Sequence, residues 1–245
     1  MKVILDQTPS RKKQDRNSVG QSGLDVFAGI AHDLRSPLAT ITTSAELLEN
    51  ELDSDSSGYL ISVIQRQVQR LQLMIQDIAE YAAFESGTVC LHPRTVDLTE
   101  LMKQTCTDVQ MLDNRHHITL EMPASPVRLN GDSAKLQRVL ENLLLNAFKY
   151  SPAGTTVRTR LRFDDPLTAV LEVEDEGPGV PDNCRETIFQ PFVRLEPGSN
   201  QGYGLGLNVV KSIVEAHRGR VWVESGVIGS RFCVQLPIGG FSADD

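Results

Sequence analysis

The sequence predicts an α+β protein in which an N-terminal antiparallel helical hairpin is followed by an α/β sandwich. Apolar residues repeat at heptad spacing over residues 27–52 and again over 61–82, which indicates two amphipathic helices. The polar string ELDSDSSG at 51–58 separates these repeats and is rich in turn-forming residues. Beyond residue 98, helical patterns alternate with β-rich runs, which is typical of a mixed sheet covered on one face by helices.

At 245 residues the chain has room for one small and one medium domain. The heptad pattern ends in the string ESGTVCLHPR, whose Gly and Pro mark a boundary near residue 88. We expect a polar linker or frayed helix start at 1–23, the helical hairpin at 24–87, a linker at 88–97, the α/β domain at 98–240 and a tail at 241–245.

Composition narrows the classes of function. A net charge of −8 argues against a sequence-independent nucleic-acid binder. No apolar run approaches the roughly 20 residues that span a bilayer, so we expect no membrane segment in this chain; a membrane-anchored parent protein is compatible with it. The four cysteines show no CxxC or metal-ligand spacing, which favours a reducing compartment such as the cytoplasm.

The hairpin pattern predicts a homodimer. The first seam comprises Phe27, Ala31, Leu34, Leu38, Ile41, Ala45, Leu48 and Leu52. The second comprises Ile61, Ile64, Val68, Leu71, Ile75, Ile78 and Ala82. One hairpin has too little apolar area to be stable alone, so two hairpins paired as a four-helix bundle are the simplest arrangement.

His32 lies one residue past Ala31, on the flank of the first helix and off the buried seam. An isolated surface histidine usually has no special role. Pro37, however, lies within the same helical pattern, where proline costs roughly 3 kcal/mol and bends the helix. A proline at this position therefore indicates that the helix near His32 has a role beyond packing.

The string FAGIAHDLRSPL at 27–38 resembles the H-box of the histidine kinases. The resemblance implies that His32 is the phosphoacceptor, because a neutral imidazole is a competent nucleophile near neutral pH. Asp33 would bind the other ring nitrogen or take up the proton lost on phosphorylation. Ser36, at i+4 on the same helix face, would help to hold a water for dephosphorylating a partner; it could equally be an ordinary surface serine.

The string LENLLLNAFKYSP at 140–152 places two asparagines four residues apart on one face of a helix, where each could instead cap or bond locally. It resembles the N-box of the histidine kinase catalytic domain, within the Bergerat-type (GHKL) ATPase group that includes gyrase and the Hsp90 chaperone. By that resemblance Asn146 supplies an amide oxygen to Mg²⁺ and Asn142 lies beside the phosphates. Lys149 would neutralise phosphate charge and Tyr150 would lie against adenine.

The string EDEGPGVP at 174–181 follows a β-rich run and could be a simple turn. It resembles the family's G1 box, which makes Asp175 the acceptor for the adenine amino group and so selects ATP. Gly177 and Gly179 would let the backbone approach the nucleotide. The next string, IFQPFVR, resembles the F-box, whose Phe189 and Phe192 would anchor a lid or simply pack in the core. The lid would be the following segment LEPGSNQ, which closes over the nucleotide.

In the string GYGLGLNVVKSIVEAHRG, glycines open a helix whose free amide N–H groups could bind an anion. A dinucleotide-binding loop is the alternative interpretation. Such a loop needs its glycines early in a strand–loop–helix unit and an acidic residue about 20 positions later. In this sequence the nearest equivalent positions fall in the terminal β-rich runs. The run resembles the G2 box, which assigns five residues to the nucleotide site: Gly202, Gly204, Leu205, Gly206 and Leu207. The later GVIGSRF resembles the terminal Gly-Ser/Thr element, with Ser230 reaching adenine through water.

These boxes occur in family order over roughly residues 24–238. The resemblance implies a sensor histidine kinase core that uses Mg-ATP to phosphorylate its own His32 and passes the phosphoryl group to an aspartate of a response-regulator receiver domain. Two alternatives stay open, namely a nucleotide-gated scaffold that binds ATP without phosphorylation and a regulator that acts mainly as a phosphatase. The stimulus, the cognate regulator, and transfer within or between subunits are not determined by the sequence.

Overall fold

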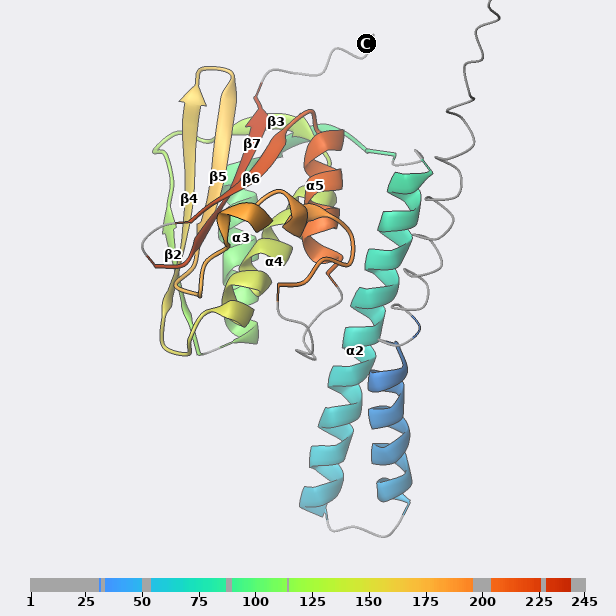
Figure 1. Cartoon of the computed structure of the whole chain (residues 1–245). Coiled ribbons are helices and arrows are strands. Elements are labelled where there is room, and N and C mark those ends of the chain that lie inside the picture. The colour runs from blue at the N-terminus through green and yellow to red at the C-terminus, as the bar shows by residue number, and fades with distance from the viewer. Residues whose placement is uncertain are drawn as a thin grey trace, which may run out of the picture. The chain divides into compact units, whose positions relative to one another are not determined.

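The computed structural model describes residues 31, 34–49, 54–86, 90–113, 115–195, 204–225 and 228–238 (Figure 1). The chain forms two compact units, the first extending to Met74 and the second beginning at Ile75. Helix α2, Ser54–Glu85, contributes to both units.

The first unit contains the predicted pair of helices. Residues 34–48 are helical and lie alongside the N-terminal half of α2 (Figure 1). Helix α2 begins at Ser54, inside the segment whose composition predicted a turn, because Ser and Asp are also favourable at helix N-termini. Among the described residues, no helix has both the length and the apolar character needed to cross a bilayer.

The second unit is built on a five-stranded sheet in the order β2-β4-β5-β7-β6. The strands are β2 His117–Glu121, β4 Thr156–Asp165, β5 Thr168–Glu174, β6 Arg220–Ser225 and β7 Ser230–Pro237. Strands β2 and β4 pair in parallel, and the other neighbours are antiparallel. All five β-rich runs in the sequence are therefore strands of one mixed sheet, as predicted.

A second, two-stranded sheet was not predicted. Strand β1, Arg94–Asp97, pairs antiparallel with β3, Arg128–Gly131. Each strand has only four residues, too few for alternation of apolar and polar side chains to be recognised.

Helices α3 Leu98–Leu112, α4 Ser133–Tyr150 and α5 Gly206–Ala216 cover one face of the large sheet (Figure 1). The inner stripe of α4, including Leu140, Leu143 and Leu144, is completely buried in the common core. Aspartates cap two of the helices: Asp97 accepts hydrogen bonds from the first-turn amides of α3, and Asp132 does so for α4. This packing fixes which face of α4 is left for a ligand.

Candidate functional site

The two N-box asparagines lie on the face of α4 that is not packed into the core. Leu143, Leu144 and Ala147 point inward and are buried, whereas Asn142 and Asn146 are only partly buried. The α-helical repeat places these amides one turn apart, as the sequence predicted. The side of α4 that faces away from the core therefore presents two neighbouring amide groups.

The N-terminus of α5 meets this face of α4. A Cβ atom on Gly206, the first residue of α5, would lie 3.1 Å from Oδ1 of Asn142. Leu205 occupies the N-cap position and has no side chain that could accept from the first-turn amides, in contrast to the aspartate caps of α3 and α4. These uncapped N–H groups and the helix dipole favour an anion next to Asn142.

Asp175, immediately after β5, is 4% exposed and is held by the backbone. Its Oδ1 accepts hydrogen bonds from the N–H of Gly177 at 2.8 Å and of Ser230 at 3.2 Å. Burial raises the pKa of the Asp175 carboxyl group, and these two backbone donors lower it in part. Since both donors bind Oδ1, the backbone holds the carboxylate in one orientation and uses only one of its two oxygens.

Close backbone packing joins the G1 box to the end of α4. A Cβ on Gly177 would lie 2.9 Å from the carbonyl oxygen of Tyr150, and Ser151 Oγ accepts a 3.4 Å hydrogen bond from the N–H of Glu176. Gly179 has a φ of +78°, which favours glycine. The N-box and the G1 box are thus fixed against each other.

The backbone just before and at the start of β7 packs closely against Asp175. Gly229 has a φ of +77°, and a Cβ there would lie only 1.8 Å from the carbonyl oxygen of Asp175. Ser230 is buried, and its carbonyl oxygen accepts a 2.9 Å hydrogen bond from the N–H of Asp175. The structure thus brings Ser230 beside Asp175, and its expected contact with adenine through water remains a prediction.

Lys149 and Tyr150 contact each other at the end of α4. Lys149 Nζ donates a 2.6 Å hydrogen bond to the Tyr150 hydroxyl and lies 4.3 Å from the centre of the ring. Tyr150 is 40% exposed. Their predicted contacts with phosphate and adenine remain predictions.

The two ends of the predicted lid segment are tied together. Phe192 has a φ of +64° and donates a 2.9 Å backbone hydrogen bond to the carbonyl oxygen of Gly204. Gly204 has a φ of +71°, and a Cβ there would lie 2.8 Å from the backbone of Phe192. Phe189 is buried and packs edge-on against Phe232, with ring centres 6.4 Å apart. The F-box therefore anchors both the core and the base of the segment.

The remaining predicted site residues are outside the described residues, in the first unit, or in the first turn of α5. His32, Asp33 and Gly202 lie outside the described residues. Ser36 belongs to the first unit and is exposed on the helical segment 34–48. Leu207 is partly buried in the first turn of α5.

The donor set fits a magnesium–nucleotide complex better than a protein-only metal site. Within the described ranges, no group of three or more His, Cys, Asp or Glu side chains could hold a metal ion. Mg²⁺ is commonly held by one or two protein oxygens together with substrate phosphates. The amide oxygen of Asn142, next to the anion-favouring end of α5, and that of Asn146, one turn further along α4, are of that kind.

The sequence interpretation missed three supporting residues. Gly229 is within the quoted string GVIGSRF, but its close approach to Asp175 depends on the pairing of β5 with β7. Ser151 is within the N-box string, but its bond to Glu176 depends on the fold. His217 gave no signal at all: it is 1% exposed, its Nε2 accepts from the N–H of Asp132 at 2.9 Å, and its Nδ1 donates to the Ile213 carbonyl oxygen at 2.8 Å.

Comparison with known proteins agrees with this geometry. Residues 24–87 match the His Kinase A (phospho-acceptor) domain, and residues 131–240 match the histidine kinase-, DNA gyrase B- and HSP90-like ATPase family. The chain is 34% identical over 221 residues to the sensor histidine kinase TmoS of Ectopseudomonas mendocina, an alignment that covers 87% of this chain and 23% of TmoS.

Two further comparisons concern mycobacterial proteins. The chain is 32% identical over 243 residues to the signal transduction histidine-protein kinase/phosphatase MprB of Mycobacterium sp. (strain KMS), which covers 94% of this chain and 45% of that protein. A solved structure of the mycobacterial sensor histidine kinase MprB matches with 33% identity and a TM-score of 0.54, covering 59% of this chain and 97% of that one. The chain thus spans less than half the length of either curated relative. It belongs to the sensor histidine kinases of two-component systems.

Proposed function

We propose that this chain is the core of an ATP-dependent protein-histidine kinase that phosphorylates its own His32. The observation that carries the proposal is the convergence of Asn142, the uncapped N-terminus of α5 and the buried Asp175 carboxylate in one unit. An amide, an anion-favouring helix end and an oriented carboxylate are the groups needed for the phosphates and the adenine of ATP. The family matches supply the phosphoacceptor domain at 24–87.

The nucleotide would span the two ends of this site. Asp175 Oδ2 would accept a hydrogen bond from the exocyclic amine of adenine, with Ser230 beside it through water and Tyr150 against the ring. The phosphates would lie at the start of α5, near Gly204, Leu205, Gly206 and Leu207, with Gly202 contributing from the preceding loop. Gly177 and Gly179 would keep the wall next to the base free of side chains.

Mg²⁺ would be held by Asn146, with Asn142 beside the phosphates. The ion would offset negative charge on the phosphates during transfer. Lys149 would assist by leaving the Tyr150 hydroxyl and turning toward the phosphates, a rotation that a flexible lysine side chain permits.

At the acceptor, a ring nitrogen of His32 would attack the γ-phosphorus. A nitrogen–phosphorus bond forms while the bond from the γ-phosphorus to the bridging oxygen breaks, and ADP leaves. The imidazole proton passes to Asp33 as the adjacent base. The phosphoryl group would then be transferred to an aspartate of a response-regulator receiver domain.

The proposal also covers the roles of the two domains, the oligomeric state and the cellular compartment. Residues 24–87 would form the dimerising phosphotransfer domain and 98–240 the catalytic domain. The pattern of exposed seam residues on α2 supports a homodimer, because Ile61, Val68 and Ile75 follow one another at heptad spacing and are 48%, 41% and 60% exposed. All four cysteines are free, which supports a cytoplasmic location.

The testing experiment is incubation of the purified chain with γ-labelled Mg-ATP. We expect wild type to acquire label, and both His32→Ala and Asn146→Ala to remain unlabelled, the first for lack of an acceptor and the second for lack of a productive nucleotide complex. Asn183→Ala, an exposed asparagine outside the site, serves as the matched control. Absence of label in wild type that still binds ATP would favour a nucleotide-gated scaffold.

A phosphatase activity toward the partner is a second candidate. It is supported by the exposed side chain of Ser36, which follows His32 by four residues in the sequence, and by the kinase/phosphatase name of the relative MprB. We expect Ser36→Ala to slow the loss of label from a phosphorylated receiver domain while leaving the labelling of His32 unchanged. Equal loss with wild type and variant would exclude a role for Ser36.

A further inference from the structure

His116 is a buried histidine in the loop that joins α3 to β2, within the second unit. It is 1% exposed, and its ring stacks on that of Phe148 in α4 with ring centres 4.9 Å apart. The side chain of Gln110 fixes the loop, because its Nε2 donates a 2.8 Å hydrogen bond to the His116 carbonyl oxygen and its Oε1 accepts one of 2.8 Å from the Ile118 N–H. The histidine ring is therefore held in place beside the end of α4.

The ring of His116 makes one hydrogen bond among the described residues. Its Nε2 lies 3.3 Å from the carbonyl oxygen of Ser151. A carbonyl oxygen can only accept, so Nε2 is the nitrogen that carries the donated proton. The other nitrogen, Nδ1, has no hydrogen-bond partner in the described ranges, since Asp113 Oδ2 approaches it only to 3.6 Å. The polar contact of this ring is thus directed at Ser151.

Ser151 connects the histidine to the proposed adenine site. Its N–H donates a 3.0 Å hydrogen bond to the Ala147 carbonyl oxygen and so closes the last turn of α4. Its Oγ accepts a 3.4 Å hydrogen bond from the N–H of Glu176, the residue after Asp175. The carbonyl of Ser151 is therefore bound by His116 and its hydroxyl by the G1 box, and a shift of this residue would displace the backbone next to Asp175.

Other hydrogen bonds between the same two loops hold different residues. Gly154 donates a 2.7 Å backbone hydrogen bond to the Arg115 carbonyl oxygen, and the N–H of His117 donates one of 3.2 Å to the Thr155 carbonyl oxygen. These bonds attach residues 154 and 155, whereas His116 reaches residue 151. Removing the His116 donor should therefore leave the loops attached and affect Ser151 and the G1 box locally.

We propose that His116 is a positioning residue that fixes the G1 box for adenine through Ser151. The inference rests on the proposed function, in which Asp175 accepts a hydrogen bond from the adenine amine. A binding group stays in its productive position only if neighbouring hydrogen bonds hold it there. His116 does not touch the nucleotide; it keeps Ser151, and through it the backbone of Glu176, in the position that Asp175 needs.

Two substitutions separate the hydrogen bond of His116 from its packing. His116→Phe keeps a flat ring against Phe148 and removes the donor, whereas His116→Gln removes the ring and keeps a side-chain N–H. We expect the Kd of a non-hydrolysable ATP analogue with Mg²⁺, measured by titration calorimetry, to rise about fivefold in His116→Phe, the fold-change that corresponds to one neutral hydrogen bond. His116→Gln should bind nearly as wild type. The reverse order of the two variants would overturn the proposal.

Circular dichroism separates a displaced site from a lost fold. Unfolding alone raises the apparent Kd fivefold only if about four-fifths of the chains are unfolded. We expect His116→Phe to keep the wild-type spectrum at the temperature of the titration. His217→Gln, which replaces another buried histidine, is the control and should keep the wild-type Kd. A loss of folded protein large enough to explain the weaker binding of His116→Phe would overturn the proposal.

Ser151→Ala tests the same link without changing His116. The variant removes the acceptor of the Glu176 N–H, so we expect a similar rise in Kd, about fivefold. His116→Phe added to Ser151→Ala should raise the Kd further by less than about twofold, because the two side chains act through one connection. Fully additive effects in the double variant would overturn the proposal.

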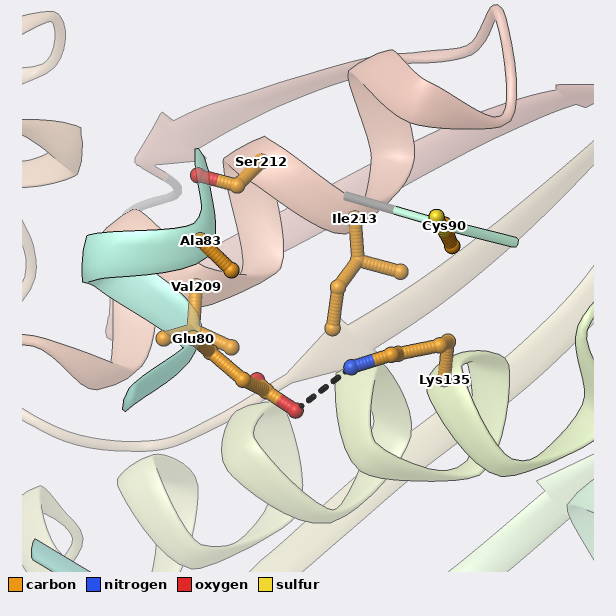
Figure 2. A pocket seen from close by; sticks show the side chains of 7 residues that line it. All are labelled: Glu80, Ala83, Cys90, Lys135, Val209, Ser212 and Ile213. Carbon is orange, nitrogen blue, oxygen red and sulfur yellow. Dashed lines mark hydrogen bonds and ion pairs between the residues drawn. The ribbon is translucent and has the colours of Figure 1, made fainter. Parts of the chain in front are cut away.

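Ser212→Ala is the matched control for the loss of a buried serine hydroxyl. Ser212 is buried like Ser151, and its hydroxyl donates a 2.9 Å hydrogen bond to the Asn208 carbonyl oxygen within α5. Figure 2 shows that Ser212 lines a cavity of about 220 Å³ together with Lys135, near the start of α4, whereas Ser151 follows the end of that helix. The control should bind the analogue with the wild-type Kd.

The calorimetric readout keeps this proposal separate from the kinase activity. Wild type that binds the analogue but acquires no label from γ-labelled Mg-ATP would refute the proposed function and leave the role of His116 in nucleotide binding intact. The same Kd for wild type, His116→Phe and Ser151→Ala would refute the role of His116, whatever the labelling.

Discussion

Asp175 combines two roles that a single substitution separates. Its Oδ1 holds the backbone of the G1 box and of β7, and its Oδ2 is the proposed acceptor for the adenine amine. In Asp175→Asn, the amide oxygen keeps the first role, whereas the amide nitrogen cannot accept a hydrogen bond from the adenine amine. A hydrogen bond to a charged group contributes about 1.5–3 kcal/mol, so we expect ATP affinity to fall about tenfold or more. Titration calorimetry measures the change.

Asp175→Ala provides the contrast, because it removes the acceptor for both backbone donors and should also lower the free energy of unfolding by about 1–3 kcal/mol. Asp108→Asn, at an exposed position of α3, controls for loss of charge alone. An Asp175→Asn protein that binds ATP as tightly as wild type would remove Asp175 from the adenine site.

His217 predicts a pH dependence of stability. Burial lowers its pKa below 6.5, against the raising effects of the Ile213 carbonyl and Asp132. The folded protein therefore binds fewer protons at this site than the unfolded chain, and stability falls as the pH drops below about 6.5. Denaturant unfolding at several pH values should show this loss for wild type and less of it for His217→Gln, whose side chain does not titrate.

Asp132, which caps α4 and accepts from the backbone of His92, adds a further loss of stability at lower pH. Although burial raises its pKa, backbone N–H groups of His92, Lys135 and Ala134 lower it more, to a net value below 3.8. Its contribution to stability is present above pH 3.8 and is lost as the pH falls through its folded-state pKa.

A His217→Gln protein with wild-type acid sensitivity between pH 6.5 and 5 would contradict the role given to His217.

At the scale of elements, the seam of α2 predicts the oligomeric state. Ile61 and Val68 are exposed in one chain and lie seven residues apart at equivalent heptad positions, so a partner hairpin would bury both. Burying a side chain of this size stabilises by about 1.5–3 kcal/mol, and a buried unpaired glutamate opposes it. We expect Ile61→Glu with Val68→Glu to shift the protein from dimer to monomer in light scattering, and exposed Gln69→Glu to leave the dimer intact. A wild-type monomer would refute the seam.

The long, periodic elements were the predictable ones. Helices α3 and α4 and the five strands of the large sheet follow from apolar periodicity, which reflects burial on one face. Strands β1 and β3 are too short to show a period. The start of α2 was misplaced because Ser and Asp favour both turns and helix N-termini. Local preference alone does not decide between these two structures.

Some residues of the candidate site were likewise predictable from the sequence, and others were not. Asn142, Asp175 and the glycines of α5 were predictable because each has a local string with a distinctive spacing. The support given by Gly229, Ser151 and His217 was not, since it arises from residues brought together by strand pairing and helix packing.

At the scale of the whole molecule, a bound nucleotide should stabilise the fold. A ligand that binds only the folded state adds about 2.7 kcal/mol at a concentration of 100 times its Kd. We expect a non-hydrolysable ATP analogue with Mg²⁺ to raise the Tm of wild type and of Asn183→Ala, and to raise that of Asn146→Ala much less. Chelation of Mg²⁺ by EDTA should remove most of the shift in wild type. An equal shift with and without Mg²⁺ would contradict the metal role of Asn146.

We expect ATP bound in the second unit to phosphorylate one histidine of this chain, His32. The measurement that tests it most directly is the location of the phosphoryl group after incubation of wild type with γ-labelled Mg-ATP, by peptide mapping under neutral conditions. We expect one labelled peptide, containing His32, whose label is lost in acid and kept in base. Label on any other residue, or label at His32 that survives acid, would contradict it.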